Sequence, residues 1–266
     1  MSTSKVILVT GGSSGLGQAM CVRLAAAGHT VVGTARRPEG TPNGYTLQAM
    51  DLTSEASVQQ AVDAVIAKHS RIDVLINNAG QGIQGPAEDT PVDLAQQLFD
   101  ANFFGLHRVC RAVLPGMRTR KSGLIINVSS IAANFGLPYR AFYSASKAAV
   151  DRYSEALSIE LKPFNVKVVV VQPGEFNTAI ANNRLRPAVI GPDYAKGYER
   201  AMNVLSSSMH YSRDPDELAV VVARIVADPS PALVYRVAQG VQKLSVLLKK
   251  LLPGRRFERM VGKHYE

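Results

Sequence analysis

Two side chains in this sequence, Tyr143 and Lys147, could act together as an acid. They are four residues apart, and on a helix residues at positions i and i+4 share one face. A tyrosine normally keeps its proton until about pH 10, but a neighbouring ammonium favours the phenolate and lowers the pKa of the phenol. We therefore predict that Tyr143 exchanges a proton near neutral pH. The same spacing is typical of a solvated surface pair, so other motifs must support the prediction.

A glycine-rich segment near the start of the chain provides that support. It follows the apolar run 6–9, which predicts a strand, and it precedes apolar residues at helical spacing. Glycine is needed where a chain turns tightly and approaches a diphosphate, and the following helix presents free N–H groups to the anion. We predict a phosphate-binding loop, the alternative being a glycine turn without a ligand. The residues assigned to the loop are Thr10, Gly11, Ser13, Ser14, Gly15, Leu16 and Gly17.

With these motifs the chain resembles the short-chain dehydrogenase/reductase family. The resemblance implies catalytic roles for four residues: Asn102, Ser130, Tyr143 and Lys147. Asn102 corresponds to an asparagine that distorts a helix and anchors a proton-relay water. Ser130 lies thirteen residues before Tyr143, as the catalytic serine of the family does, and this spacing favours it over the adjacent Ser129.

The resemblance covers about residues 5 to 233 and also implies cofactor-binding residues. Asp51 would hold the adenine, Asn78 and its neighbours would line the adenosine, and the loop that begins at Pro173 would fix the nicotinamide carboxamide. Beyond the glycine-rich loop, the implied residues are Asp51, Leu52, Asn78, Ala79, Gly80, Tyr143, Lys147, Pro173, Gly174, Phe176 and Thr178.

Apart from any resemblance, these side chains suit hydride transfer between a carbonyl carbon and a cofactor. Reduction places negative charge on the substrate oxygen, so donors aimed at that oxygen stabilise the transition state. Ser130 and Tyr143 would be those donors, with Tyr143 as general acid or, for alcohol oxidation, general base. Lys147 would lower the pKa of Tyr143 and hold the nicotinamide ribose, and Asn102 would connect Lys147 to solvent through water.

The end of the second predicted strand indicates which nicotinamide cofactor binds. An NAD site usually carries an acidic residue there for the ribose 2′-hydroxyl, whereas an NADP site offers an arginine for the 2′-phosphate. Here Ala35 stands at the acidic position, and Arg36 and Arg37 follow it. A guanidinium can bind phosphate through two hydrogen bonds. We predict NADP(H); the alternative is that both arginines are ordinary loop charges.

The pattern of strands and helices predicts an α/β fold. Valine and isoleucine fill the strands without polar alternation, which is typical of a parallel sheet covered on both faces. We expect one Rossmann-type, doubly wound domain over residues 1–266 with a C-terminal helical extension, and ligands at the carboxyl ends of its strands. Strands are expected from 5 and near 30–35, 46–50, 73–77, 123–129 and 166–172. Helices are expected from 16, over 54–69, through Asn102 to about 114, and over 142–162, ended by Pro163.

Composition predicts the setting of the protein. No signal peptide and no apolar run that could span a bilayer is recognisable in the 266 residues, so we expect a cytoplasmic protein. Cys21 and Cys110 lie in apolar helical patterns without partners that could bind a metal. We predict two buried free thiols and no metal site.

Two segments carry the question of the substrate. Residues 179–213 hold tyrosines and methionines, which fit equally a lid over an apolar substrate and two short helices that only pack onto the core. From residue 236 onward, eight Lys or Arg stand against two Glu, and apolar residues recur at helical spacing. This basic segment could adhere to an anionic membrane, or it could dock on the domain or on a partner subunit with its basic face solvated, and we favour docking. No nucleic-acid recognition motif accompanies the charge.

Within the family, the sequence most resembles the 17β-hydroxysteroid and retinol dehydrogenase type. This implies a lipophilic ketone, aldehyde or alcohol as substrate and a homo-oligomer, dimer or tetramer, formed by the helices around 100 and 150. Reduction of a 3-oxoacyl thioester is the alternative reaction, and a cofactor-binding regulator without turnover is the alternative class. The segments that carry the subfamily resemblance are 82–86, 136–138 and 162–164.

Overall fold

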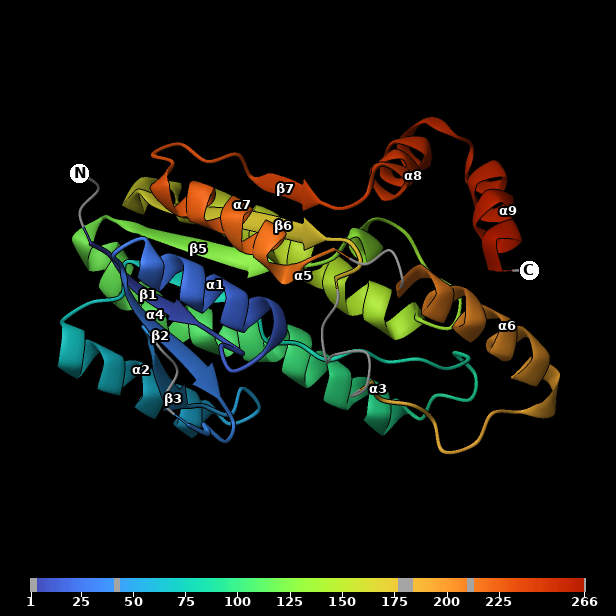
Figure 1. The fold of residues 1–266 in the computed structure, drawn as a ribbon, viewed down its shortest axis with the longest axis horizontal. Helices are drawn as coiled ribbons and strands as arrows, with labels where there is room; N and C mark the ends of the chain where they lie inside the picture. Colours follow the sequence, from blue (N-terminus) through green and yellow to red (C-terminus); the bar gives the residue numbers. More distant parts are fainter. Residues whose placement is uncertain (1–3, 41–43, 177–183, 210–212, 266) are drawn as a thin grey trace.

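The protein is built around one seven-stranded sheet, seen in a computed structural model that describes residues 4–40, 44–176, 184–209 and 213–265 (Figure 1). All strand pairs are parallel, in the order β3-β2-β1-β4-β5-β6-β7. The order reverses between β1 and β4, the point at which ligands bind in open α/β sheets. The strands are β1 (Val6–Val9), β2 (Thr30–Ala35), β3 (Thr46–Ala49), β4 (Val74–Asn77), β5 (Gly123–Val128), β6 (Val166–Pro173) and β7 (Val234–Val237).

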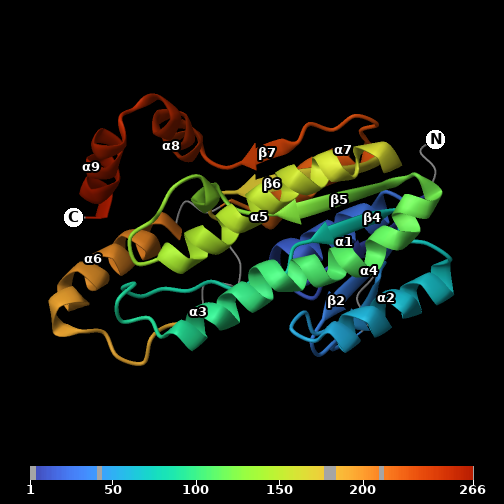
Figure 2. The ribbon, with the colours of Figure 1, turned by 180° about the vertical axis from the view of Figure 1, so that it is seen from behind.

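Helices cover both faces of the sheet (Figures 1 and 2). One face packs against α1 and α7, and the other packs against α2, α4 and α5. The predicted doubly wound parallel α/β fold is confirmed. The helices are α1 (Gly15–Ala26), α2 (Glu55–His69), α3 (Val92–Phe99), α4 (Gly105–Arg120), α5 (Ala141–Glu160), α6 (Pro192–Met209), α7 (Pro215–Ala227), α8 (Gly240–Leu251) and α9 (Gly254–Tyr265).

The helix expected to end at about residue 114 does not end there. α4 continues to Arg120 with Pro115 inside it. A proline removes one helical hydrogen bond, but Val113 and Met117 are both buried on the same side of the helix. Burial of this apolar face outweighs the missing bond, so the predicted end at about 114 was wrong. α5 ends at Glu160, close to the predicted end, before a 3-10 turn.

A π-helical turn, Asp100–Phe104, joins α3 to α4. Asn102 is buried at its centre, where the resemblance implied a residue that distorts a helix. Such turns are rare and often occur at functional sites.

The C-terminal segment forms two helices that lie with α6 beyond the carboxyl ends of the strands (Figures 1 and 2). The helical spacing of its apolar residues therefore predicted α8 correctly. Both cysteines, Cys21 and Cys110, are buried and free, as expected. No helix within the described ranges is long and apolar enough to cross a bilayer.

Candidate active site

The glycine-rich turn leaves β1 and enters α1 in a conformation that excludes larger residues. Gly11 and Gly15 have φ angles of +68° and +53°, a region that side-chain-bearing residues rarely adopt. A Cβ at Gly12 would lie 2.6 Å from Gly33 Cα, and one at Gly17 would collide with the carbonyl oxygen of Gly11. The turn is thus compact enough for a backbone to approach a diphosphate.

Thr10 and Asn78 brace this turn from either side. The Thr10 hydroxyl accepts hydrogen bonds from the backbone N–H groups of Asn78 and Ala79, both at 3.0 Å. The Asn78 amide donates to the carbonyl oxygens of Thr10, at 2.9 Å, and Gly11, at 3.3 Å. Asn78 therefore links the end of β4 to the turn.

The start of α1 is free to receive an anion. Ser14 is the N-cap residue, but its side chain makes no capping hydrogen bond, and the first turn carries no acidic residue. Ser13 and Ser14 are exposed, and Leu16 lines the cavity described below. Free N–H groups and the positive end of the helix dipole suit a phosphate, so the turn fits the diphosphate of a nicotinamide dinucleotide.

The ends of β2 and β3 bring the predicted adenine-side residues together. Arg36 and Arg37 directly follow β2 and are exposed. Asp51 follows β3 and accepts hydrogen bonds from the Thr53 backbone, at 3.0 Å, and hydroxyl, at 2.8 Å. These bonds lower the pKa of Asp51, and the nearby charge of Arg36 adds to the effect. Leu52 packs against the core beneath α2 and α4.

Ser130, Tyr143 and Lys147 line one cavity of about 560 Å³ at the carboxyl ends of the strands. Lys147 is buried, and its ammonium donates to the Val128 carbonyl oxygen at 3.0 Å. The Ser130 hydroxyl accepts a hydrogen bond from the Ala132 N–H at 3.1 Å, which leaves its own proton to donate. The Tyr143 hydroxyl has no hydrogen-bond partner among the described residues. Two donors are thus available to a ligand.

Ser129 has a different role from Ser130. Its hydroxyl donates to the Lys147 carbonyl oxygen at 3.1 Å, so it holds α5 against the end of β5. This bond commits the proton of Ser129 to the protein, in agreement with the choice of Ser130 from the spacing.

Asn102 fixes the backbone around Lys147. Its amide oxygen accepts from the Gln81 N–H at 2.7 Å, and its amide nitrogen donates to the Gln81 carbonyl at 2.9 Å and to Ser146 Oγ at 3.2 Å. A Cβ at Gly80 would lie 3.2 Å from the Asn102 amide oxygen and 3.4 Å from Lys147 Nζ. The structure therefore brings Asn102, Gly80 and Lys147 together.

The loop after β6 forms another part of the wall. Pro173, Gly174 and Phe176 all line the cavity, and Gly174 N–H donates to the Val237 carbonyl at 2.9 Å. Thr178, predicted to contact the nicotinamide carboxamide, lies outside the described residues.

The opposite wall consists of residues that the sequence reasoning did not place at the site. Arg140 donates from Nη2 to the Tyr265 hydroxyl at 2.8 Å and so ties the start of α5 to α9. The apolar repeat of α8 was noticed in the sequence, but nothing there indicated which surface it covers. The additional lining residues include Ile83, Phe135, Leu137, Arg140, Arg184, Val204, Leu205, Val241, Leu244, Leu248, Met260, Val261 and Tyr265.

Two guanidinium groups make this wall positive. Arg184 lines the cavity above Gly82 and, within the described ranges, makes no hydrogen bond or ion pair. Burial lowers the pKa of Arg184, and the charge of Arg140, which lines the same cavity, lowers it further. Glu175 lines the same cavity as a single carboxylate.

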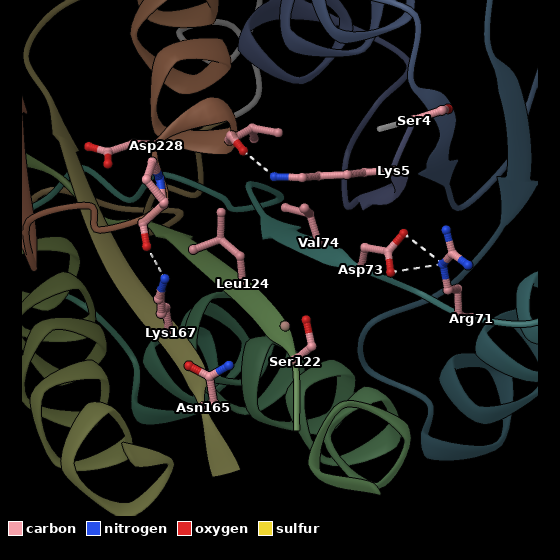
Figure 3. Close-up of a pocket in the computed structure, with 13 residues that line it drawn as sticks. Ser4, Lys5, Arg71, Asp73, Val74, Ser122, Leu124, Asn165, Lys167 and Asp228 are labelled. Atoms are coloured by element: carbon pink, nitrogen blue, oxygen red, sulfur yellow. Dashed lines mark hydrogen bonds and ion pairs between the residues drawn. The ribbon is translucent and has the colours of Figure 1, made fainter. Parts of the chain in front are cut away.

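A second cavity, of about 260 Å³, lies at the amino ends of the strands (Figure 3). Its charged residues are already paired. Lys5 and Lys167 each donate to a backbone carbonyl in or just after α7. Asp73 accepts from the Val6 N–H at 2.8 Å and pairs with Arg71 at 3.0 Å. These interactions close the bottom of the sheet.

A parallel sheet with a glycine turn after β1 and a serine, a tyrosine and a lysine around one cavity defines a class, the nicotinamide-dependent oxidoreductases. A sequence model described as short chain dehydrogenase matches residues 5–188. The chain belongs to the short-chain dehydrogenase/reductase family, of the 17β-hydroxysteroid/retinol dehydrogenase type, and is an enzyme that acts on carbonyl or alcohol groups.

The chain is similar to characterised relatives over most of its length. It is 41% identical to 3-ketodihydrosphingosine reductase of Bacteroides thetaiotaomicron over 94% of this chain and 93% of that protein. It is 30% identical to retinol dehydrogenase 8 of Bos taurus over 86% of this chain and 80% of that protein. A short-chain dehydrogenase structure from Streptomyces avermitilis superimposes with a TM-score of 0.82 at 32% identity, over 94% and 93%.

Two further solved structures hold a cofactor. One is a 3-ketoacyl-(acyl-carrier-protein) reductase from Brucella melitensis with NADH, at 26% identity and a TM-score of 0.75, over 90% of this chain and 98% of that chain. The other is a short-chain dehydrogenase from Burkholderia cenocepacia with NADP, at 26% identity and a TM-score of 0.74, over 95% and 94%. Relatives of this fold thus bind NAD(H) or NADP(H).

Proposed function

We propose that the protein is an NADP(H)-dependent reductase of a lipophilic ketone, with Tyr143 as the general acid. The observation that carries the proposal is the cavity itself. In it, the Tyr143 hydroxyl, which has no hydrogen-bond partner among the residues that the structure describes, and the free proton of Ser130 share the cavity with a largely apolar wall from α8 and α9. A ketone carbon bearing an apolar chain fits such a cavity.

The nicotinamide supplies the hydride, and the residues of this chain hold the substrate oxygen and move its proton. Ser130 and Tyr143 donate hydrogen bonds to the carbonyl oxygen, where negative charge develops as the hydride arrives. Tyr143 then transfers its proton to that oxygen. Lys147, held by the Val128 carbonyl, places a positive charge near the phenolate that remains.

Asn102 acts as a positioning residue in this mechanism. Both polar atoms of its side chain are engaged, by the Gln81 backbone and Ser146, so a relay water would bind another group, such as the Asn102 main-chain carbonyl. The side chain instead holds Gly80 and the π-helical turn against α5, which fixes the space around Lys147.

NADP(H) is proposed over NAD(H) because Arg36 and Arg37 are exposed at the end of β2, where Ala35 stands at the position that is acidic in NAD sites. The Asp51 carboxylate is near Arg36 but is engaged by Thr53. A 2′-phosphate would meet two guanidiniums there that make no ion pair within the described part of the chain.

Among lipophilic ketones, a long-chain 3-ketone is the substrate class we favour. The relative with 41% identity is a 3-ketodihydrosphingosine reductase, whose name describes a ketone on a long-chain lipid. Phe135, Leu137 and, on α8, Leu248 line the same cavity as Tyr143, so an apolar chain would find apolar side chains there. Steroids and retinoids are the other members of the proposed class.

A 3-oxoacyl thioester is the second candidate substrate. Arg140 and Arg184 place two positive charges in the cavity, and carriers of such thioesters bear phosphate. The presence of Asn102, Ser130, Tyr143 and Lys147 together argues against a regulator that binds the cofactor without turnover.

The test is a cofactor titration followed by a substrate comparison. NADPH should bind at least tenfold more tightly than NADH, and Arg36→Ala should remove most of this difference. With NADPH, turnover of 3-ketodihydrosphingosine is compared with that of 3-oxoacyl-coenzyme A in wild type and Arg184→Met. A long-chain ketone that turns over equally in both proteins supports the first candidate. A thioester that turns over only in wild type supports the second, and tighter binding of NADH contradicts the cofactor assignment.

We also propose a homo-oligomer formed through α4, α5 and the π-helical turn. Phe104 and Ile159 are exposed there, and Phe103, Tyr153 and His107 form an aromatic cluster beside them. Light scattering of the purified protein would give the number of copies, and Phe104→Asp should produce monomers.

A further inference from the structure

We propose that the outer face of α8 docks on the surface of an anionic lipid bilayer and that lipophilic substrates enter the active-site cavity from there. The docking rests on α8 itself, whereas the delivery of substrate rests on the function proposed above.

The exposed face of α8 is a continuous apolar strip. Val241, Leu244, Leu247 and Leu251 are 78%, 50%, 51% and 70% exposed. They follow one another at intervals of three or four residues and are therefore neighbours on one side of the helix. The other large apolar side chains that are exposed in the described ranges lie singly on separate elements. A contiguous apolar cluster of this kind marks an interaction surface.

The apolar strip continues into the active site. Val241 and Leu244 line the cavity together with Leu248, while Leu247 and Leu251 do not. One helix face thus runs from the wall that faces Tyr143 to the outside of the molecule. An acyl chain could follow this face without crossing water, because apolar side chains accompany it along the whole path.

Charge selects an anionic bilayer as the occupant. Lys243 and Lys250 are exposed and lie four residues before and three residues after Leu247, so both border the same edge of the apolar strip. From residue 236 onward the chain has eight Lys or Arg against two Glu. An apolar helix face bordered by lysine binds at the interface of a bilayer, and anionic lipids strengthen the binding.

The side of α8 opposite the apolar strip already packs against the domain, so the strip is not the surface by which α8 joins the core. Val246 is buried against Ile131 and Ala238, and a capping box formed by Gln239 and Gln242 fixes the start of the helix. This is the docked arrangement favoured from the sequence. It holds α8 in place and presents the strip outward, so docking on the domain and contact with a membrane are compatible.

A second copy of the chain fits the apolar strip less well. A two-fold contact along α8 would bring Lys243 and Lys250 of one copy close to the same residues of the other, and like charges repel. The strip is also one side of a helix about 18 Å long, which is small beside the roughly 800 Å² that each partner buries in a typical stable interface.

Vesicle co-sedimentation of the full chain, without substrate, tests the docking. We expect binding to vesicles of phosphatidylglycerol and phosphatidylcholine, and much weaker binding to phosphatidylcholine alone or in high salt. Leu247→Gln with Leu251→Gln should reduce the binding about a hundredfold. Lys243→Gln with Lys250→Gln should reduce it about tenfold.

The matched control is Val22→Gln with Val92→Gln, which replaces two apolar side chains that are 49% and 72% exposed on α1 and α3. It should bind vesicles as wild type does. The docking is overturned if the variant with both leucines replaced still binds vesicles as wild type does. It is also overturned if the control variant loses as much vesicle binding as the leucine variant. A third contradicting result would be a wild-type protein that does not bind vesicles but forms a dimer, which the two leucine changes dissociate.

Turnover separates the docking from the proposed function. Leu247 and Leu251 lie outside the cavity, so their replacement should leave the reduction of a water-soluble ketone unchanged and slow the reduction of a ketone presented in vesicles. If wild type binds vesicles but reduces neither ketone, the docking stands, and the proposed function fails by itself.

Discussion

The two cavities at opposite ends of the sheet both contain charged side chains but differ in how their polar groups are paired. At the amino ends, Lys5 and Lys167 donate to backbone carbonyls and Asp73 accepts from backbone and arginine. At the carboxyl ends, the Tyr143 hydroxyl and the Arg184 guanidinium have no hydrogen-bond partner among the described residues. Charge in a concave surface is thus poor evidence for a ligand, whereas unpaired donors are good evidence.

Among changes in the two cavities, the largest loss of activity is expected for Tyr143→Phe at the carboxyl ends of the strands. Loss of the general acid should reduce kcat about 10²–10⁴-fold, whereas NADPH binding should stay within a fewfold of wild type. Stopped-flow measurement of NADPH oxidation and a fluorescence titration of NADPH give the two values. A variant that keeps a tenth or more of the wild-type kcat would show that another group supplies the proton.

Gly17→Ala should have the next largest effect. The added methyl group meets the carbonyl oxygen of Gly11, which is backbone and cannot move without changing the turn. We expect NADPH to bind at least tenfold more weakly.

Gly136→Ala is the matched control, because a Cβ there meets no heavy atom within 4 Å and its backbone is not left-handed. Equal NADPH affinity of both variants in a fluorescence titration would contradict a phosphate-binding role of the turn.

At the amino ends, Lys5→Met and Lys167→Met should affect stability but not catalysis. Each change removes a hydrogen bond to the end of α7, which is worth about 1 kcal/mol, so Tm should fall by about 2–4 °C. The kcat/KM of the same proteins should remain within about twofold of wild type. A tenfold loss of kcat/KM would mean that this cavity serves the reaction.

An effect on stability of similar size, but dependent on pH, is expected for a buried carboxylate, Asp151. Burial raises the pKa of Asp151, although the hydrogen bond that it accepts from Gln172, at 2.6 Å, opposes the rise. Because the folded state holds this proton more tightly than the unfolded state, stability falls as pH rises from about 4 through the raised pKa.

Asp151→Asn keeps an oxygen that accepts the hydrogen bond from Gln172, and it removes the loss of stability that the ionisation of Asp151 causes at high pH. Its Tm should exceed that of wild type by about 2–4 °C at pH 7.5, and the difference should shrink toward pH 4. A difference independent of pH would assign the effect to packing instead of ionisation.

The sequence predicted the residues whose neighbours are set by local structure. The glycine turn follows from one strand, one turn and one helix, and Tyr143 and Lys147 share a face because α5 is helical. The strands end at a common edge, so motifs at those ends meet in space. The fold class and the placement of these motifs were therefore predictable.

Contacts between distant segments were not predictable from the sequence alone. Arg140 and Tyr265 are 125 residues apart, and their hydrogen bond depends on how α9 packs. The apolar face of α8 is visible as a pattern, but a pattern does not say whether a helix faces a cavity, a core or a membrane. The length of α4 was missed for a related reason, since the burial of Met117 overrides Pro115.

The π-helical turn at Asp100–Phe104 has a consequence for changes in chain length. A π-helical turn is one residue longer than the corresponding α-helical turn, so removal of one residue there would leave a regular helix. The wide turn absorbs the extra residue, so α3 and α4 would keep their faces after the deletion, but the side chains of the turn itself would move to new positions. Asn102 would then lose Gln81 and Ser146. At this position the enzyme should tolerate many substitutions of exposed residues but no single-residue deletion.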